Sequence, residues 1–498
     1  MTLTTFDMTP GIAKSLRPID RATFVGLREE DRVILVELIN RLNSKRMRNE
    51  LRRRYYDEHN TLKSLGIAIP PSLTTVQVVA GWPAKAVDSM SRRTVLEGMV
   101  SASGGEELAA IVRNVWEDNS IDFEASAAHT SALIHSCAFG FVHAGDTSAG
   151  EPPVLITMRS AESATGVWSR RLRGLTSALS IVEEDVKTGQ PTIMNLYLPN
   201  RVVTLRRSAF GVYDAEEQWH GMGVPVEVLP YRADLDRPFG RSRITRAVMY
   251  NTDAAMRTML RTEVGAEFYN APQRYALGAD EDAFKDKAGN VQPAWTVMLG
   301  RMLTMTKDED GDLPQVGQFA QQTMQPNIEQ LRAIAQMFAA ETSLPVGSLG
   351  IVQDNPESAE AIRARHEELG IEIEHWERTA LAPAWRRLMI RAVAMSTDSP
   401  AAISEAVELQ PVWGSWSAPS EVSQAQAAQA RINAIPALAE TDVELERMGY
   451  TPSQIERVKM QMSRSRGASA LDRALAAAQP QQPAVADQVQ GGAGDVPQ

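Results

Sequence analysis

The sequence predicts an α+β fold in which helices predominate. Apolar residues recur at helical spacing over residues 30–56 and again over long stretches after residue 240. Between about residues 152 and 230, short apolar runs alternate with Gly, Pro and Asn, which is the pattern of strands and turns. At roughly 150 residues per domain, a chain of 498 residues holds about three structural units.

Composition and charge exclude several classes of protein. A single cysteine, Cys137, excludes a disulfide framework and a multi-cysteine zinc site, and its apolar neighbours indicate a buried thiol. The N-terminus lacks a secretory pattern and no run reaches about 18 apolar residues, so we expect an intracellular protein with no transmembrane helix and no membrane partner. The net charge of −11 argues against tight wrapping of nucleic acid, but not against DNA that passes through a channel.

A long amphipathic helix is predicted over residues 30–56. Its apolar positions are Leu35, Leu38, Leu42, Leu51 and Tyr55. The run Arg52–Arg54 is interpreted as the solvated face of this helix, with anion binding as the alternative. The Pro70-Pro71 pair ends the region, because proline cannot continue a helix.

Three shorter helices and five strands are predicted between residues 82 and 230. The helices begin at Trp82-Pro83, at about residue 105 and at about residue 123, and the last extends to about residue 139 with His129, His135 and Cys137 on it. Two histidines six residues apart lie on different faces of a helix, which favours packing over a shared metal. The predicted strands are Val154–Met158, Ala178–Val182, Ile193–Leu198, Arg201–Leu205 and Val226–Leu229.

The pattern of residues in the second half of the sequence predicts a stalk. Two helices, over about 242–269 and 326–341, bracket a turn-rich excursion over 271–322. A long helix follows the Asp354-Asn355-Pro356 turn, and we expect Pro383 to kink or interrupt it. Further helical pattern covers 420–470, and the end of the chain has the composition of a disordered tail.

The sequence contains no recognisable catalytic signature. Both the phosphate-binding G-x-x-x-x-G-K-[ST] pattern and the zinc-binding H-E-x-x-H pattern are missing. Asp308, Asp310 and Asp312 alternate as in a calcium loop, but Leu313 stands where that loop needs glycine. We therefore expect no catalytic residue, no metal site and no cofactor.

Several segments, spread over most of the chain, nevertheless resemble a known family. They are Tyr55–His59, Leu65–Pro71, Gly81–Pro83 with Val87-Asp88, Trp116–Asn119 with Asp122, Phe239–Ile244, Ala271–Tyr275 with Gly278, and Asp354–Ile362. In order and spacing they resemble the portal proteins of tailed bacteriophages, in particular the SPP1-type portals of phages that infect actinobacteria. Each segment alone is weak evidence for the family, because none is a catalytic motif.

The resemblance implies a portal fold with named regions. They are a wing over 1–240 (a helical part over 30–145 and a β-rich insert over 152–230), a stem helix over 241–270, a small β-rich clip over 271–322, a second stem helix over 323–342, a tunnel loop over 343–358, a long wing helix over 359–395, a crown over 396–465 and a disordered tail over 466–498.

The resemblance also implies an assembly and its partners. We expect a homo-oligomeric ring, usually of twelve copies, at one capsid vertex, with double-stranded DNA passing through its channel without sequence specificity. The further partners implied are the terminase large subunit, a head–tail adaptor, and the major capsid and scaffold proteins. The location implied is the virion, and the host cytoplasm during assembly.

Three groups of residues are the candidate functional residues. The tunnel loop would present Gln353, Asp354, Asn355, Pro356, Glu357 and Ser358 to DNA. A docking surface on the clip, for which plain solubility is the alternative, would use Asp280, Glu281, Asp282, Asp308, Glu309, Asp310 and Asp312. The basic residues near the first stem helix are interpreted as forming surface or intersubunit salt bridges, with a basic belt inside the channel as the alternative: Arg241, Arg243, Arg246, Arg257 and Arg261.

Two other classes of function remain open from sequence. One is another capsid or head-closure structural protein, which the stalk-like arrangement disfavours. The other is a soluble enzyme without a recognisable motif, which the failed motif search disfavours.

Overall fold

The computed structural model describes most of the chain. The described residues are 23–60, 62, 78–208, 210–270, 274–277, 315–318, 323–351, 359–417, 421–450, 454–455 and 457–464. The chain divides into two units, Met1–Trp416 and Ser417–Gln498. The expected α+β class, with more residues in helices than in strands, is confirmed.

The largest sheet of the first unit has six strands in the order β1-β9-β8-β7-β6-β5. They are β1 (Phe24–Val25), β5 (Ala164–Ser169), β6 (Gly174–Glu184), β7 (Pro191–Leu198), β8 (Arg201–Arg207) and β9 (Tyr213–Trp219). Neighbouring strands are antiparallel, except that β1 runs parallel to β9. Side chains alternate between the two faces, so each face has its own apolar partners.

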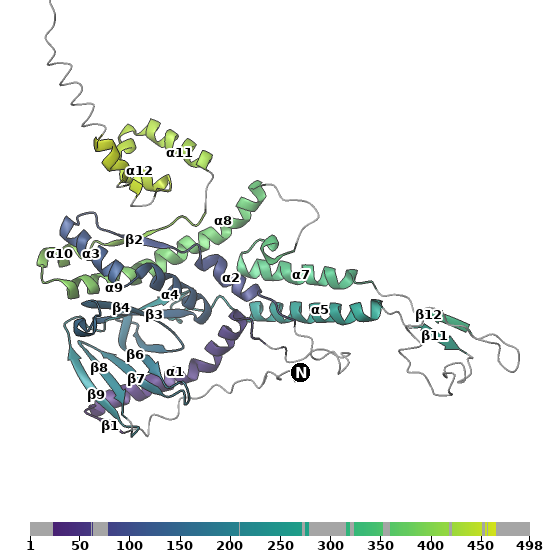
Figure 1. Cartoon of the computed structure of the whole chain (residues 1–498), viewed down its shortest axis with the longest axis horizontal. Helices are drawn as coiled ribbons and strands as arrows, with labels where there is room; N and C mark the ends of the chain where they lie inside the picture. The colour runs from purple at the N-terminus through teal and green to yellow at the C-terminus, as the bar shows by residue number, and fades with distance from the viewer. Residues whose placement is uncertain are drawn as a thin grey trace, which may run out of the picture. The chain divides into compact units, whose positions relative to one another are not determined.

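Helix α1 (Glu29–Tyr56) covers one face of this sheet (Figure 1). Its buried Leu35 and Leu38 pack against strand residues such as Leu196, which confirms the predicted helix. An ion pair fixes the start of the helix, because Arg201 of β8 donates two hydrogen bonds to the buried Asp31 carboxylate, each 2.6 Å long. Helix and sheet thus form two layers.

A three-stranded sheet, β10-β3-β4, forms the next layer. Its strands are β3 (Cys137–Ala144), β4 (Val154–Ser160) and β10 (Val226–Pro230). Along β3, Phe139 and Phe141 face the six-stranded sheet, whereas Ala138 and Val142 face a helical core. Gly140 suits this close packing, because a Cβ atom would lie 2.6 Å from Leu388 Cδ1 of the covering helix and that side chain would have to shift.

The helical layer contains the largest core of the molecule. It is built from α2 (Trp82–Ser91), α3 (Glu106–Asp118), α4 (Ile121–His135), α9 (Ala382–Ser396) and α10 (Pro400–Ala406), with β2 (Leu96–Val100) paired to β13 (Gln410–Trp413). At its centre, Trp385 Nε1 donates a 3.0 Å hydrogen bond to His129 Nε2, while His129 Nδ1 lies 3.1 Å from the Thr94 carbonyl. The prediction that His129 packs in a core is confirmed.

The expectation of one helix over 123–139 is wrong at its C-terminal end. Helix α4 ends at His135, because Ser136 adopts a left-handed conformation with φ of 88°. Strand β3 then begins at Cys137, whose thiol is buried as expected, and this burial raises its pKa to about 12. The apolar run around Cys137 suits either a helix or a strand, and the left-handed backbone of Ser136 ends the helix before this run.

The long helix predicted after the 354–356 turn is present. Helix α8 (Ala359–Trp376) continues through a π-helical turn, Glu377–Leu381, into α9. The irregularity precedes Pro383, which has no N–H to bond the carbonyl of Thr379. The wide turn accommodates this missing hydrogen bond, so the proline interrupts the regular pattern without ending the helix.

A pair of antiparallel helices confirms the predicted helix–excursion–helix arrangement (Figure 1). Helix α5 (Arg246–Asn270) and helix α7 (Gln325–Thr342) lie side by side. In sequence, strand β11 (Arg274–Leu277) follows α5 and strand β12 (Gln315–Gln318) precedes α7. The two strands pair with each other antiparallel. The rest of the excursion lies outside the described residues.

The second unit contains α11 (Glu421–Ala434) and α12 (Asp442–Arg447). Arg431 of α11 holds the buried Glu444 carboxylate of α12 through its Nε and Nη2 atoms, the latter at 2.6 Å. Among the helices that the structure describes, none is both long and apolar enough to span a membrane.

We predict that replacing His129 with Gln reduces the pH dependence of stability. Burial lowers the His129 pKa from 6.5 to about 4, so the unfolded chain binds a proton that the folded chain refuses between these values. The free energy of unfolding therefore falls as the pH falls through this window, by up to about 1.4 kcal/mol per pH unit. Glutamine can keep both hydrogen bonds without titrating.

Thermal midpoints at pH 7 and pH 5 test this prediction. The wild-type midpoint should drop more than that of His129→Gln, while buried His135, whose pKa is also lowered, contributes equally to both proteins. Equal drops would show that His129 does not carry this pH dependence.

Candidate functional site

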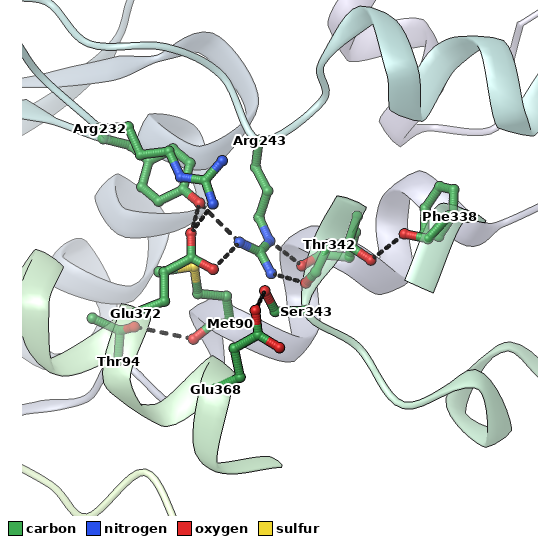
Figure 2. Close-up of polar contacts among 11 residues, drawn as sticks. Met90, Thr94, Arg232, Arg243, Phe338, Thr342, Ser343, Glu368 and Glu372 are labelled. Atoms are coloured by element: carbon green, nitrogen blue, oxygen red, sulfur yellow. Dashed lines mark hydrogen bonds and ion pairs between the residues drawn. The ribbon is translucent and has the colours of Figure 1, made fainter. Parts of the chain in front are cut away.

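The α5–α7 helix pair is anchored at its root by one buried side chain, that of Arg243 (Figure 2). Only 2% of this side chain is exposed, and it reaches segments that are far apart in sequence. Its Nε donates to the Ala86 carbonyl of α2 at 2.9 Å, and its Nη2 donates to the Thr342 carbonyl at the end of α7 at 2.6 Å. Its Nη1 pairs with Glu372 of α8 at 3.1 Å.

The local sequence explains why Arg243 points inward. Gly240 has a φ of 69°, and a Cβ atom there would lie 2.1 Å from the Tyr231 carbonyl, so only glycine fits this close approach. Ser242 then donates to the Ile134 carbonyl at 2.6 Å and accepts from the Ile244 amide at 2.9 Å. The turn that these contacts fix aims Arg243 into the protein just before α5 begins.

Glu372 is the acidic centre of this buried cluster. It accepts a hydrogen bond from the Tyr231 hydroxyl, and it pairs with both Arg243 and Arg232, the latter at 2.7 Å. Burial alone would raise the pKa of Glu372, but the Arg243 and Arg232 guanidinium groups and the hydrogen bond from Tyr231 together outweigh it and hold the pKa below its usual range. Burial raises the pKa of Tyr231, so its hydroxyl stays protonated and donates.

A cavity of about 680 Å³ opens beside this cluster, and its charged lining is largely paired. The lining includes the Arg232–Glu372 pair and the 2.8 Å Arg241–Asp234 pair. Among the described residues, no group of three or more His, Cys, Asp or Glu side chains is placed to hold a metal ion. Paired charges and buried hydrogen bonds suit a structural anchor more than a reaction centre.

The structure separates the five predicted basic residues. Arg243 lies inside the subunit, so we assign it to the anchor and not to a channel or an intersubunit surface. Arg241 is exposed and pairs with Asp234. Arg246 and Arg261 are exposed on α5, and Arg257 is half-buried there.

The other predicted residues lie outside the described residues. They are Gln353, Asp354, Asn355, Pro356, Glu357 and Ser358, and Asp280, Glu281, Asp282, Asp308, Glu309, Asp310 and Asp312. Sequence reasoning missed Tyr231, Arg232 and Glu372. A signal for Glu372 was present, because it stands between Leu369 and Ile373 of the apolar seam that was expected to pack.

We predict that Arg243→Ala strongly destabilises the subunit. The substitution leaves the Glu372 charge and the Thr342 carbonyl buried with fewer partners, which typically costs about 3–5 kcal/mol. Arg243→Lys should recover only part of this loss, because an ammonium cannot make the same fork of hydrogen bonds.

Thermal unfolding of Arg241→Ala is the matched control. Arg241 lies two residues away, is exposed and has one surface ion pair, so its loss should cost at most about 1 kcal/mol. Similar midpoints for the Arg243 and Arg241 variants would contradict the anchoring role.

Comparisons with known proteins agree with the resemblance seen in the sequence. The chain matches the family described as "Phage portal protein, SPP1 Gp6-like" over residues 36–436. It is 27% identical to the portal protein of Mycobacterium phage D29 over 389 residues, covering 75% of this chain and 76% of that protein. It is also 27% identical to the portal protein of Mycobacterium phage L5 over 396 residues, with the same coverage.

Two solved structures are also similar in part. One is the virion of a native gene transfer agent particle (TM-score 0.37, 13% identity, 74% of this chain and 90% of that chain). The other is the neck of a native gene transfer agent particle computed with C12 symmetry (TM-score 0.36, 14% identity, 74% and 89%). The family match covers most of this chain, and the chain therefore belongs to the SPP1 Gp6-like family of phage portal proteins and functions as a portal protein of the phage virion.

Proposed function

We propose that the protein forms a closed ring of twelve copies at one capsid vertex, and that this ring is the channel for packaging and ejecting double-stranded DNA. The observation that supports this most is the family match over residues 36–436, which includes both helices of the α5–α7 pair and α8. Identical copies close into a ring when each uses two different faces and the rotation per copy fits. The role is structural, and ATP hydrolysis would belong to the terminase.

In this proposal the parts of the chain have separate tasks. Residues 353–358, which directly precede α8, would face the DNA, and the acidic residues between 280 and 312 would dock the terminase large subunit and then the head–tail adaptor. The major capsid and scaffold proteins would contact the ring from the shell during assembly in the host cytoplasm. The charge of −11 per copy disfavours adhesion of DNA, so duplex would slide without sequence preference.

We predict that the purified protein assembles into rings. Negative-stain images should show a central hole of roughly 20 Å or more, the width of duplex DNA, and native mass spectrometry should give about 655 kDa for twelve copies of 54.6 kDa. A protein that stays monomeric at high concentration, with or without scaffold protein, would contradict the proposal.

We predict that bulky substitutions in the loop before α8 impair DNA packaging without preventing ring assembly. Asn355→Trp and Ser358→Trp would narrow the channel if these residues line it. Packaged DNA per particle measures the effect, and Val186→Trp, at a position 95% exposed in the turn after β6, is the matched control. Loss of rings in the loop variants would instead assign the loop a structural role.

A further inference from the structure

Two turns of the first unit, the one that joins β5 to β6 and the one that follows β10, lie next to each other. Trp168 of β5 packs edge-on against Phe239, which follows β10, with ring centroids 6.3 Å apart. Farther along the same two segments, Arg170 Nη2 lies 3.5 Å from Asp236 Oδ1. The side chains of both turns therefore belong to one continuous surface.

This surface holds an excess of positive charge. Residues 169–174 and 231–241 contain six arginines but only two acidic residues, both aspartates. Three of the arginines are paired with carboxylates, in the pairs Arg170–Asp236, Arg241–Asp234 and Arg232–Glu372. The other three are exposed, and among the residues that the structure describes no carboxylate forms an ion pair with them: Arg171, Arg173 and Arg237.

Two exposed leucines stand among these arginines. Leu172, between Arg171 and Arg173, is 67% exposed, and Leu235 is 93% exposed. A single exposed leucine is ordinary on a protein surface. Two of them on neighbouring turns, beside unpaired guanidinium groups, give the combination of apolar contact area and arginine that is typical of protein–protein interfaces. We call Arg171, Leu172, Arg173, Leu235 and Arg237 the basic patch.

Local hydrogen bonds order the backbone of the basic patch. Asp234 Oδ1 accepts from the amide of Asp236 at 3.0 Å and from the amide of Arg237 at 2.7 Å, and the Arg237 amide also lies 3.1 Å from the Asp234 carbonyl. In the other turn, the Leu172 amide donates to Ser169 Oγ at 3.3 Å. A partner therefore meets turns that are already formed, which lowers the entropic cost of binding.

From this juxtaposition we propose that the basic patch docks an acidic amphipathic helix of another protein. Carboxylates of that helix pair with the three unpaired arginines, and its apolar stripe covers Leu172 and Leu235. Duplex DNA matches the patch less well, because its phosphates supply anions but its backbone offers no apolar surface to the leucines. This docking requires neither a ring nor a channel, and so goes beyond the proposed function.

Peptide binding to the full-length protein tests this docking. The probe is a fluorescent helical peptide of about five turns with leucines along one stripe and glutamates on both flanks, and the same peptide with glutamine for glutamate is the reference. Fluorescence anisotropy should show the glutamate peptide bound at least about tenfold more weakly by Arg171→Glu/Arg173→Glu, and about threefold or more weakly by Leu235→Ser. Arg113→Glu, at an exposed position of α3 outside the patch, is the matched control and should stay within about twofold of wild type.

The outcomes distinguish this docking from other uses of the basic patch. Equal affinities for the two peptides, no binding of either, or binding that Leu235→Ser leaves unchanged would overturn it. If the arginine variant instead loses binding to a duplex of about 20 base pairs, and the glutamate peptide does not bind, the patch serves nucleic acid. If that variant changes the native mass of the protein and neither probe binds, the patch is a contact between copies. Ring formation by wild-type protein is measured separately, so failure of the docking leaves the proposed function standing. Thermal midpoints within a few degrees of wild type verify that each variant folds.

Discussion

The arrangement of the first unit around its helix pair depends on the buried guanidinium of Arg243. A charge in the interior is tolerated only when ion pairs and hydrogen bonds replace its lost hydration, and here the α2 carbonyl of Ala86, the α7 carbonyl of Thr342 and the Glu372 carboxylate do so. These partners come from three helices, of which α2 is far in sequence from α7 and α8. Because the guanidinium is planar and rigid, it fixes the directions of all three at once. The helix pair is thereby held to α2 and α8 of the first unit.

Glu372 extends this constraint in both directions along one continuous helix. Helix α8 begins directly after residues 352–358 and continues through the π turn into α9. In α9, Trp385 fills the core, and Arg387 and Arg391 hold the buried Glu227 of β10. Helix α8 is therefore linked to the root of the helix pair through Glu372, and its continuation α9 is linked to the three-stranded sheet through Glu227.

The sequence predicts the long helices well and the buried site poorly, for physical reasons. Periodic leucines mark α1, and the stalk follows from two helical patterns around a turn-rich stretch, because periodicity is a local property. Strand β9 was missed because its exposed acidic residues leave little apolar signal. Arg243 looked like any other stem arginine, since its burial is decided by Gly240, by the Ser242 turn and by Glu372, which lies 129 residues away. Burial of a charge depends on tertiary contacts, which a single sequence does not display.

The net charge of −11 limits how identical copies can pack side by side. At physiological ionic strength, charges farther apart than about 8 Å are largely screened, so the overall repulsion weakens while contacts within a few ångströms persist. A contact between such copies is therefore governed by the groups that meet within a few ångströms and not by the net charge of each copy.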